Sequence, residues 1–139
     1  MALRCLPVAA PGSLLKGTAA PKAKKGETTK PVRERDAGHL EALRQCPCVA
    51  CGHDPAGEAA HISMASAKHG KPEKGMGSKS ADQWTLPLCH ACHMRSHEVG
   101  EQPFWRDLGL DPLMLAAALY RASSNIEAMR AMVFAVGPR

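Results

Sequence analysis

The chain has 139 residues, which is enough for one domain with additional arms. Its only aromatic residues are two Trp, one Tyr and two Phe, so a core this small needs a further constraint such as a bound metal. The whole net charge of +5 lies in residues 1–45, which hold nine Lys and Arg against four Asp and Glu, whereas residues 46–139 hold nine against nine. No apolar stretch approaches the ~20 residues of a membrane span, and we expect a soluble, intracellular protein.

Residues 1–36 combine Pro, Ala, Gly, Lys and Thr without periodic hydrophobicity, and six Lys and Arg lie between positions 22 and 35. This composition predicts a disordered basic tail. Such a tail attracts polyanions, nucleic acid among them, although a tail that is merely solvated has the same composition. We do not expect secretion, because the apolar run at the start of the chain is short and is broken by Pro7 and Pro11.

The first ordered elements are expected between residues 37 and 62. A short helix is predicted over 37–45. Cys48-Val-Ala-Cys51-Gly52 then has the spacing of a zinc knuckle, in which two thiolates bind the metal and the glycine permits the tight turn. Residues 58–62 form a candidate short strand that carries His61.

A polar, glycine-rich loop is predicted from Ser63 to about Ala81. Loops of this length inside a compact domain are more often functional or mobile than idle. Residues 84–88 are expected to form a second short strand that leads into Cys89. A helix from about Ala91 is expected to end near Gly100, because glycine favours helix termination.

Two more helices are expected to close the chain. Asp111 can cap a helix that has Pro112 at its first position. Ser124-Asn-Ile-Glu127 has the pattern of a capping box that opens a last helix, and Gly137-Pro138 stops it. We predict a helical hairpin over residues 109–139 that packs on the preceding domain.

Four of the six cysteines form two Cys-x2-Cys pairs, Cys48 with Cys51 and Cys89 with Cys92. Four thiolates at these intervals can close a tetrahedral shell around zinc. The long histidine-bearing segment between the pairs favours a metal site in a reducing compartment over a disulfide framework. Cys46 could replace Cys48, but the x2 spacing favours Cys48, and we assign no role to Cys46.

Three histidines have spacings that suit metal-assisted hydrolysis of nucleic acid. His93 and His97 lie four residues apart, so a helix would place both imidazoles on one face, where they can hold a divalent cation. His61, on the candidate strand, can act as the base that deprotonates a water molecule. Any one of these histidines taken alone is more often a surface or core residue, and the hypothesis depends on the three together.

These motifs combine into one longer pattern over residues 46–108. In order, it contains Cys-x2-Cys-Gly, Ala-His-Ile, Gly-Met-Gly-x-Lys, Asp82 and Pro-Leu-Cys-x2-Cys-His-x3-His-x2-Gly. The pattern resembles the HNH endonucleases, also called the ββα-metal or His-Me finger superfamily, and is most similar to the phage and prophage branch with YbcO-like and Ref-like proteins. The resemblance implies an α+β fold with a ββα-metal core over residues 37–108, and a place in the cytoplasm of a bacterial or phage-infected cell.

The resemblance also implies a role for each matching residue. His61 matches the general base at the end of the first strand. His93 and His97 match the ligands of the catalytic cation, Mg²⁺ or another divalent ion. Asp82 lies at or near the middle position of the motif, usually asparagine, which braces the loop and orients the base. The cysteines that match the structural Zn²⁺ site of many members are Cys48, Cys51, Cys89 and Cys92.

The chain departs from the family pattern at one position that bears on the metal. Many members carry a His or Asp directly before the base, and that residue also binds the cation. Ala60 stands there, so the cation would have two protein ligands unless His69 of the loop supplies a third.

Cationic side chains near the motif are expected to contact substrate phosphates, first Lys79 and Arg95 and then the loop residues Lys68, Lys71 and Lys74. Each is equally compatible with solvated surface charge. The sequence therefore predicts a metal-dependent endonuclease that hydrolyses phosphodiester bonds in DNA, with a recombination or phage protein as a further partner. Two alternatives stay open. One is a zinc-stapled DNA-binding or adaptor module without catalysis, favoured by Ala60; the other is an RNA-directed nuclease.

Overall fold

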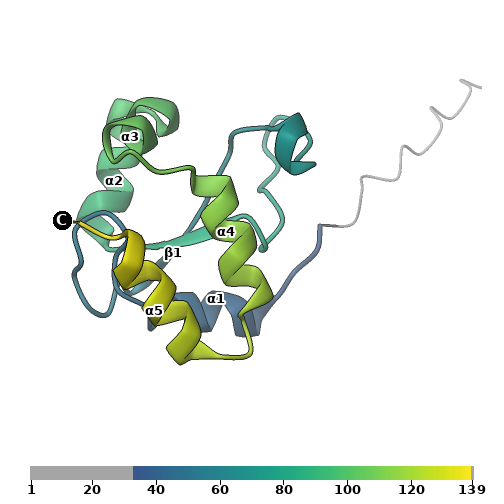
Figure 1. Cartoon of the computed structure of the whole chain (residues 1–139). Helices are drawn as coiled ribbons and strands as arrows, with labels where there is room; N and C mark the ends of the chain where they lie inside the picture. Colours follow the sequence, from purple (N-terminus) through teal and green to yellow (C-terminus); the bar gives the residue numbers. More distant parts are fainter. Residues whose placement is uncertain (1–32, 139) are drawn as a thin grey trace, which may run out of the picture. The chain divides into compact units, whose positions relative to one another are not determined.

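The computed structural model describes residues 33–138, which form a small α+β arrangement (Figure 1). Within this range there are five α-helices, one two-stranded sheet and one short 3₁₀ helix. The elements in chain order are α1 (Ala37–Arg44), β1 (Glu58–His61), η1 (Ala67–His69), β2 (Thr85–Leu88), α2 (His90–Val99), α3 (Glu101–Asp107), α4 (Pro112–Arg121) and α5 (Ile126–Val136). The predicted α+β class is confirmed. Of the predicted basic tail, only residues 33–36 lie within the described range.

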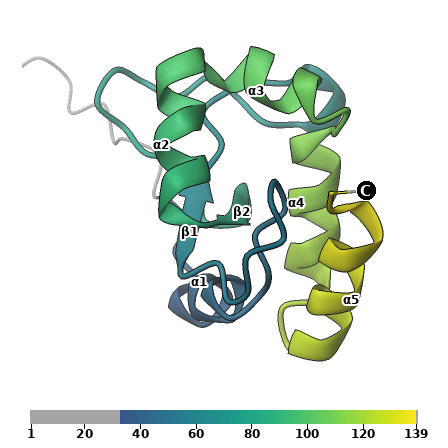
Figure 2. The ribbon, with the colours of Figure 1, turned by 90° about the vertical axis from the view of Figure 1, so that its left-hand side faces the viewer.

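The sheet consists of β1 and β2, paired antiparallel with Glu58 opposite Leu88 and His61 opposite Thr85. Helix α2 starts directly after Cys89, which follows β2, and it packs against both strands (Figure 2). The two strands and the helix therefore follow one another as β1, a long loop, β2 and α2. This order brings the first turns of α2 next to the start of β1, and leaves His61 at the opposite end of the strand.

Side-chain caps explain where three of the helices begin. The carboxylate of Asp36 accepts a hydrogen bond from the backbone N–H of His39 at the start of α1. Asp111 accepts from two backbone N–H groups of α4, which has Pro112 at its first position as predicted. The predicted capping box at α5 is wrong by one residue. Its N-cap is Asn125 rather than Ser124, since Asn125 accepts from Ala128 N–H at 3.0 Å.

Helix α3 was not predicted as a separate helix. Gly100 has φ +88°, which ends α2 and turns the chain, and α3 begins at the next residue. Pro103 falls in the first turn of α3, where proline is tolerated. Phe104 and Trp105 are buried and pack edge to face with ring centroids 4.9 Å apart.

The core is one cluster that draws side chains from the sheet and the helices around it. Helix α4 packs on β2, and α5 packs on α1. Among the fully buried side chains are Leu43 of α1, Leu86 of β2, Leu119 of α4 and Met129 of α5. The C-terminal helices therefore belong to the same core as the sheet.

The described helices include none that is both long enough and apolar enough to cross a membrane.

Candidate functional site

Four cysteines gather where the loop after α1 meets the start of α2. Cys48 and Cys51 lie in a tight turn closed by the Gly52 N–H, which donates to the Cys48 carbonyl at 2.8 Å, and Gly52 has φ +77°. Cys89 is the N-cap of α2, and Cys92 lies in its first turn. All four sulfur atoms lie within 4.8 Å of one another, and the Sγ atoms of Cys51 and Cys89 are 3.6 Å apart.

These distances suit a zinc ion. Four sulfurs at about 2.3 Å from zinc in a tetrahedron lie about 3.8 Å from one another, close to the observed separation. Among the residues that the structure describes, this is the only group of three or more potential metal ligands with mutually close ligand atoms. The predicted cluster is confirmed, and it can hold a metal such as zinc.

Burial and mutual contact perturb the pKa values of three of the four thiols. Burial raises the pKa of Cys48, and burial together with the neighbouring Cys89 raises the pKa of Cys92. Burial alone would also raise the pKa of Cys89, but hydrogen bonds from the Cys92 N–H and the neighbouring thiols outweigh it and lower that pKa. Metal binding requires the thiolate forms, so a divalent cation that binds here would displace the thiol protons.

The structure also separates Cys46 from this cluster, in agreement with the choice made from the spacing. Cys46 is buried and its thiol lies 3.4 Å from the carbonyl oxygen of Ala42. Cys46 is therefore packed against α1 rather than placed to bind the metal. Cys5 lies outside the described residues.

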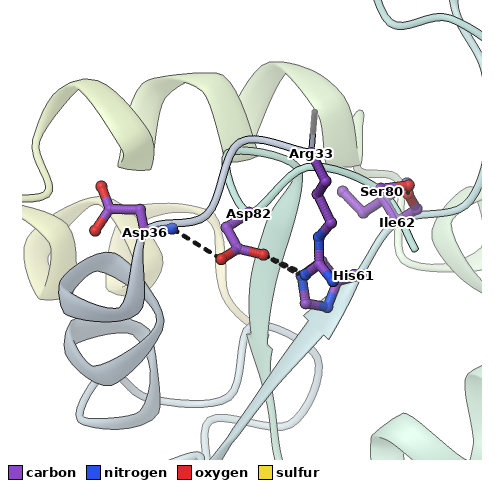
Figure 3. A network of polar contacts seen from close by, with 6 residues as sticks. All are labelled: Arg33, Asp36, His61, Ile62, Ser80 and Asp82. Atoms are coloured by element: carbon purple, nitrogen blue, oxygen red, sulfur yellow. Dashed lines mark hydrogen bonds and ion pairs between the residues drawn. The ribbon is translucent and has the colours of Figure 1, made fainter. Parts of the chain in front are cut away.

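A second cluster surrounds His61 at the end of β1 (Figure 3). The Nε2 atom of His61 lies 2.8 Å from Oδ1 of Asp82 and 2.9 Å from Nη2 of Arg33. The same Nη2 donates to Asp82 Oδ1. Beside this trio, the Ser80 hydroxyl donates to the Ile62 carbonyl at 2.6 Å, which ties the segment before Asp82 to the segment after His61. The ring of His61 is thus held by its Nε2 edge.

Asp82 is buried and is held by the segment that precedes α1 (Figure 3). Its Oδ2 accepts from the backbone N–H of Asp36 at 2.9 Å, and its own N–H donates to the Glu34 carbonyl at 3.2 Å. Burial on its own would raise the pKa of Asp82, but the hydrogen bonds from His61, Asp36 and Arg33 outweigh it and lower the pKa to about 2. Asp82 is therefore ionised at neutral pH, and it can accept a hydrogen bond from His61 Nε2–H. This contact is compatible with the orienting role predicted for it.

His93 and His97 lie one turn apart on α2, with ring centroids 4.9 Å from each other. The Nδ1 atom of His93 is 2.7 Å from the Glu58 carboxylate, and the Nδ1 atom of His90 is 2.8 Å from its other oxygen. These hydrogen bonds, first from His93 and then from His90, lower the pKa of Glu58. With Nδ1–H donated to Glu58, His93 keeps the Nε2 lone pair for a cation.

One small pocket is lined by all three histidines of the predicted catalytic set, His61, His93 and His97, together with Ala60 and Glu101. The structure therefore brings the predicted base and the two predicted ligands to the same pocket. The ligand atoms of the three histidines are not mutually as close as those of the cysteine cluster. His61 thus lies beside the His93–His97 pair rather than forming a three-histidine metal site with it.

Several predicted residues lie elsewhere. His69 does not line the pocket, because its Nε2 is 3.1 Å from Asp111 Oδ2 at the start of α4. Lys71 is buried, and its ammonium lies 3.3 Å from the Ser63 carbonyl, so it braces the loop rather than facing solvent. Lys79 and Arg95 are exposed, as a phosphate contact requires.

Sequence reasoning missed Arg33, Glu58 and Glu101. Arg33 is 28 residues before His61 and was assigned to the tail, and no local pattern links the two. Glu58 carries one signal, because it starts the strand that ends at His61, but its contact with His93 depends on the register of the sheet. The Glu101 carboxylate accepts from the Ser63 N–H at 2.8 Å, which ties α3 to the loop after His61.

Most of the chain, including the two clusters described above, matches one known protein family. Residues 21–125 match the family described as "Protein of unknown function (DUF968)", and the chain belongs to that family. The matched range includes the four cysteines and every residue of the pocket. No curated protein and no solved structure matches the chain significantly.

Proposed function

We propose that this member of the DUF968 family is a metal-dependent endonuclease that hydrolyses phosphodiester bonds in DNA. The observation that carries the proposal is the placement of His61, held by Asp82 at Nε2, in one pocket with His93 and His97. The order of β1, β2 and α2, and the cysteine cluster beside them, agree with the resemblance to HNH endonucleases and support the proposal.

His61 has the arrangement of a general base. When Nε2–H donates to the Asp82 carboxylate, the proton of the neutral ring is on Nε2 and the lone pair is on Nδ1. Nδ1 then accepts a proton from a water molecule, and the resulting imidazolium is stabilised by Asp82, which stays ionised. The water oxygen attacks phosphorus and the 3′ oxygen departs, leaving a 5′-phosphate.

His93 and His97 are the residues that would hold the catalytic cation. Glu58 orients His93 through Nδ1, as carboxylates commonly orient metal-binding histidines, and the residue one turn on adds a second imidazole. A divalent cation there would act as a Lewis acid toward the phosphate and the leaving oxygen. Two imidazoles leave the remaining positions to water and phosphate oxygens.

In this proposal the cysteine cluster is structural. It joins the turn at Cys48 and Cys51 to the start of α2, and Cys92 is the residue directly before His93. A metal there would fix the first turn of α2, and with it the position of His93 relative to β1. Closed four-cysteine sites leave no open position for a substrate.

The proposal is tested by nicking of supercoiled plasmid with Mg²⁺, with Mn²⁺ and without added metal. We expect His61→Ala to lower the cleavage rate at least about 100-fold, the usual contribution of a general base, while thermal stability and DNA binding are retained. His53→Ala is the matched control, because His53 is exposed and lies outside the pocket. Cleavage at the wild-type rate by His61→Ala refutes the role, and so does a variant that no longer folds.

A second candidate is a zinc-stapled DNA-binding or adaptor module without catalysis. It is favoured by Ala60, which lines the pocket. Ala60 offers no ligand atom at the position where many HNH endonucleases have a His or Asp that binds the cation. This candidate predicts DNA binding that survives every change at the three histidines, and no metal-dependent nicking. Side-by-side digestion of DNA and RNA separates the DNA-directed enzyme from an RNA-directed one.

A further inference from the structure

Arg33 contacts both the proposed base and the carboxylate that holds it. Its Nη2 lies within hydrogen-bonding distance of both His61 Nε2 and Asp82 Oδ1. The side chain of Arg33 is 24% exposed, whereas that of Asp82 is 4% exposed. The side chain of His61 is 21% exposed, so Asp82 is the buried member of the three and Arg33 and His61 are both partly exposed.

The close contacts of His61 Nε2 with Arg33 and with Asp82 cannot both be hydrogen bonds of a neutral ring. An arginine only donates and a carboxylate only accepts, whereas a neutral imidazole nitrogen does one or the other. If His61 Nε2 carries the proton, it donates to Asp82 and faces the donor of Arg33 at 2.9 Å. If Nε2 is unprotonated, it accepts from Arg33 and faces the Asp82 oxygen at 2.8 Å.

The two arrangements differ in their chemistry. In the first, the ring keeps a lone pair on Nδ1 and can serve as the base of the proposed reaction. In the second, the proton of the neutral ring is on Nδ1, and that nitrogen cannot accept another. Arg33 favours the second arrangement, because its positive donor is repelled by Nε2–H and attracted by the Nε2 lone pair.

Arg33 is also incompletely bound where it lies. Its Nε is buried and has no hydrogen-bond partner among the described residues, and an unsatisfied buried donor is unfavourable. A phosphate diester is a stronger partner for a guanidinium than a neutral imidazole, since it accepts two parallel hydrogen bonds. A DNA phosphate that approaches the exposed side of Arg33 can therefore compete with His61 for this guanidinium.

We propose that Arg33 is a positioning residue that opposes the basic tautomer of His61 until a nucleic-acid phosphate draws its guanidinium away. The inference rests on the proposed function, because it concerns the same base. It makes the tautomer of His61 that can act as a base depend on the presence of DNA. It also gives the segment before α1 a role beyond charge, because that segment carries Arg33 and binds Asp82 through Asp36 and Glu34.

The test is the tautomer of His61, read from two-bond ¹H–¹⁵N correlations of ¹⁵N-histidine-labelled protein in the zinc-loaded full chain. The resonances are assigned with His61→Gln. Arg33→Gln removes the cation, and Arg35→Gln is the matched control, because Arg35 lies in the same segment, is exposed and makes no side-chain hydrogen bond or ion pair within residues 33–138. A short DNA duplex without added Mg²⁺ or Mn²⁺ serves as the probe.

We expect Arg33→Gln to raise the fraction of His61 rings protonated at Nε2 at least about twofold, and Arg35→Gln to leave it unchanged. The duplex should raise the same fraction in the wild-type chain and have no further effect in Arg33→Gln. The inference is overturned if the tautomer ratio is the same in Arg33→Gln and wild type, if Arg35→Gln changes it equally, or if the duplex has no effect on the wild type.

The two proposals fail in different ways. If the chain nicks no DNA with any metal, the nuclease proposal fails whatever the tautomer measurement gives. If it nicks DNA in a His61-dependent way but the tautomer does not respond to Arg33 or to the duplex, only the role of Arg33 fails.

Discussion

Replacing Asp82 by asparagine tests how strongly the site is built into the stability of the fold. In the native chain the carboxylate is 4% exposed and its pKa is about 2, compared with an ordinary value of 3.8. At about 1.4 kcal/mol per pKa unit, that difference corresponds to roughly 2 kcal/mol of stabilisation of the ionised form. We expect Asp82→Asn to lose about this much free energy of unfolding at pH 7.

The hydrogen bonds of Asp82 also predict that Asp82→Asn lowers the free energy of unfolding. An asparagine side chain has one oxygen and one NH₂ group. If its oxygen stays with His61 and Arg33, its NH₂ group faces the backbone N–H of Asp36, which now has no acceptor. One buried donor is left unsatisfied, which is unfavourable by about 1–3 kcal/mol.

The pH dependence of stability provides a second measurement on the same pair of proteins. Because the pKa of Asp82 is lower in the folded chain than in the unfolded chain, its contribution is fully present above about pH 5. It is lost as the pH falls through about 4 toward 2. The difference in stability between wild type and Asp82→Asn should therefore shrink over this range, and the loss of zinc in acid is common to both proteins.

The assay is urea unfolding of the zinc-loaded chains, followed by circular dichroism from pH 7 to pH 3. Asp107→Asn is the matched control, because Asp107 is exposed and makes no side-chain hydrogen bond or ion pair within the described residues. A change below about 0.5 kcal/mol in Asp82→Asn, or a difference from wild type that does not vary with pH, would contradict the reasoning.

Two further predictions concern the metals. Cys89→Ser should lower the zinc content of the purified chain, measured by mass spectrometry, from one ion to well below one, and should destabilise the fold by several kcal/mol. The control variant Cys46→Ser should retain zinc. Equal zinc content in the two variants would place the metal elsewhere. Glu58→Gln should weaken the binding of Mn²⁺ about 10- to 100-fold, because His93 loses its orienting carboxylate. The affinity is measured by calorimetry on zinc-loaded protein, and Glu127→Gln, at an exposed position of α5, is the control. Unchanged Mn²⁺ affinity in Glu58→Gln would show that His93 needs no such support.

Local patterns predicted the parts of the site that depend on neighbours in the chain. The Cys-x2-Cys spacing implies two sulfurs on one turn, and both pairs meet in one cluster. The spacing of His93 and His97 implies one helical face, and their rings lie side by side. The cap of α4 and the approximate bounds of the two strands follow from the same kind of short-range signal.

Contacts between distant segments could not be predicted in this way. Arg33 reaches His61 because the segment before α1 runs past the end of β1, and its basic composition is identical to that of a solvated tail. Glu58 meets His93 only through the β1–β2 register. His69 and Lys71 looked available for metal or phosphate, but the loop folds against α4 and Ser63 and uses both side chains.

The central claim, that His61, His93 and His97 form one site for metal-assisted hydrolysis, is tested most directly by a crystal structure with Mn²⁺ and a short duplex, with the ion located by its anomalous scattering. We predict a peak at the Nε2 atom of His93 and at the His97 ring, with Nδ1 of His61 facing the phosphate beside it. An ion bound elsewhere, or a His61 ring that presents Nε2 rather than Nδ1 to the phosphate, would contradict it.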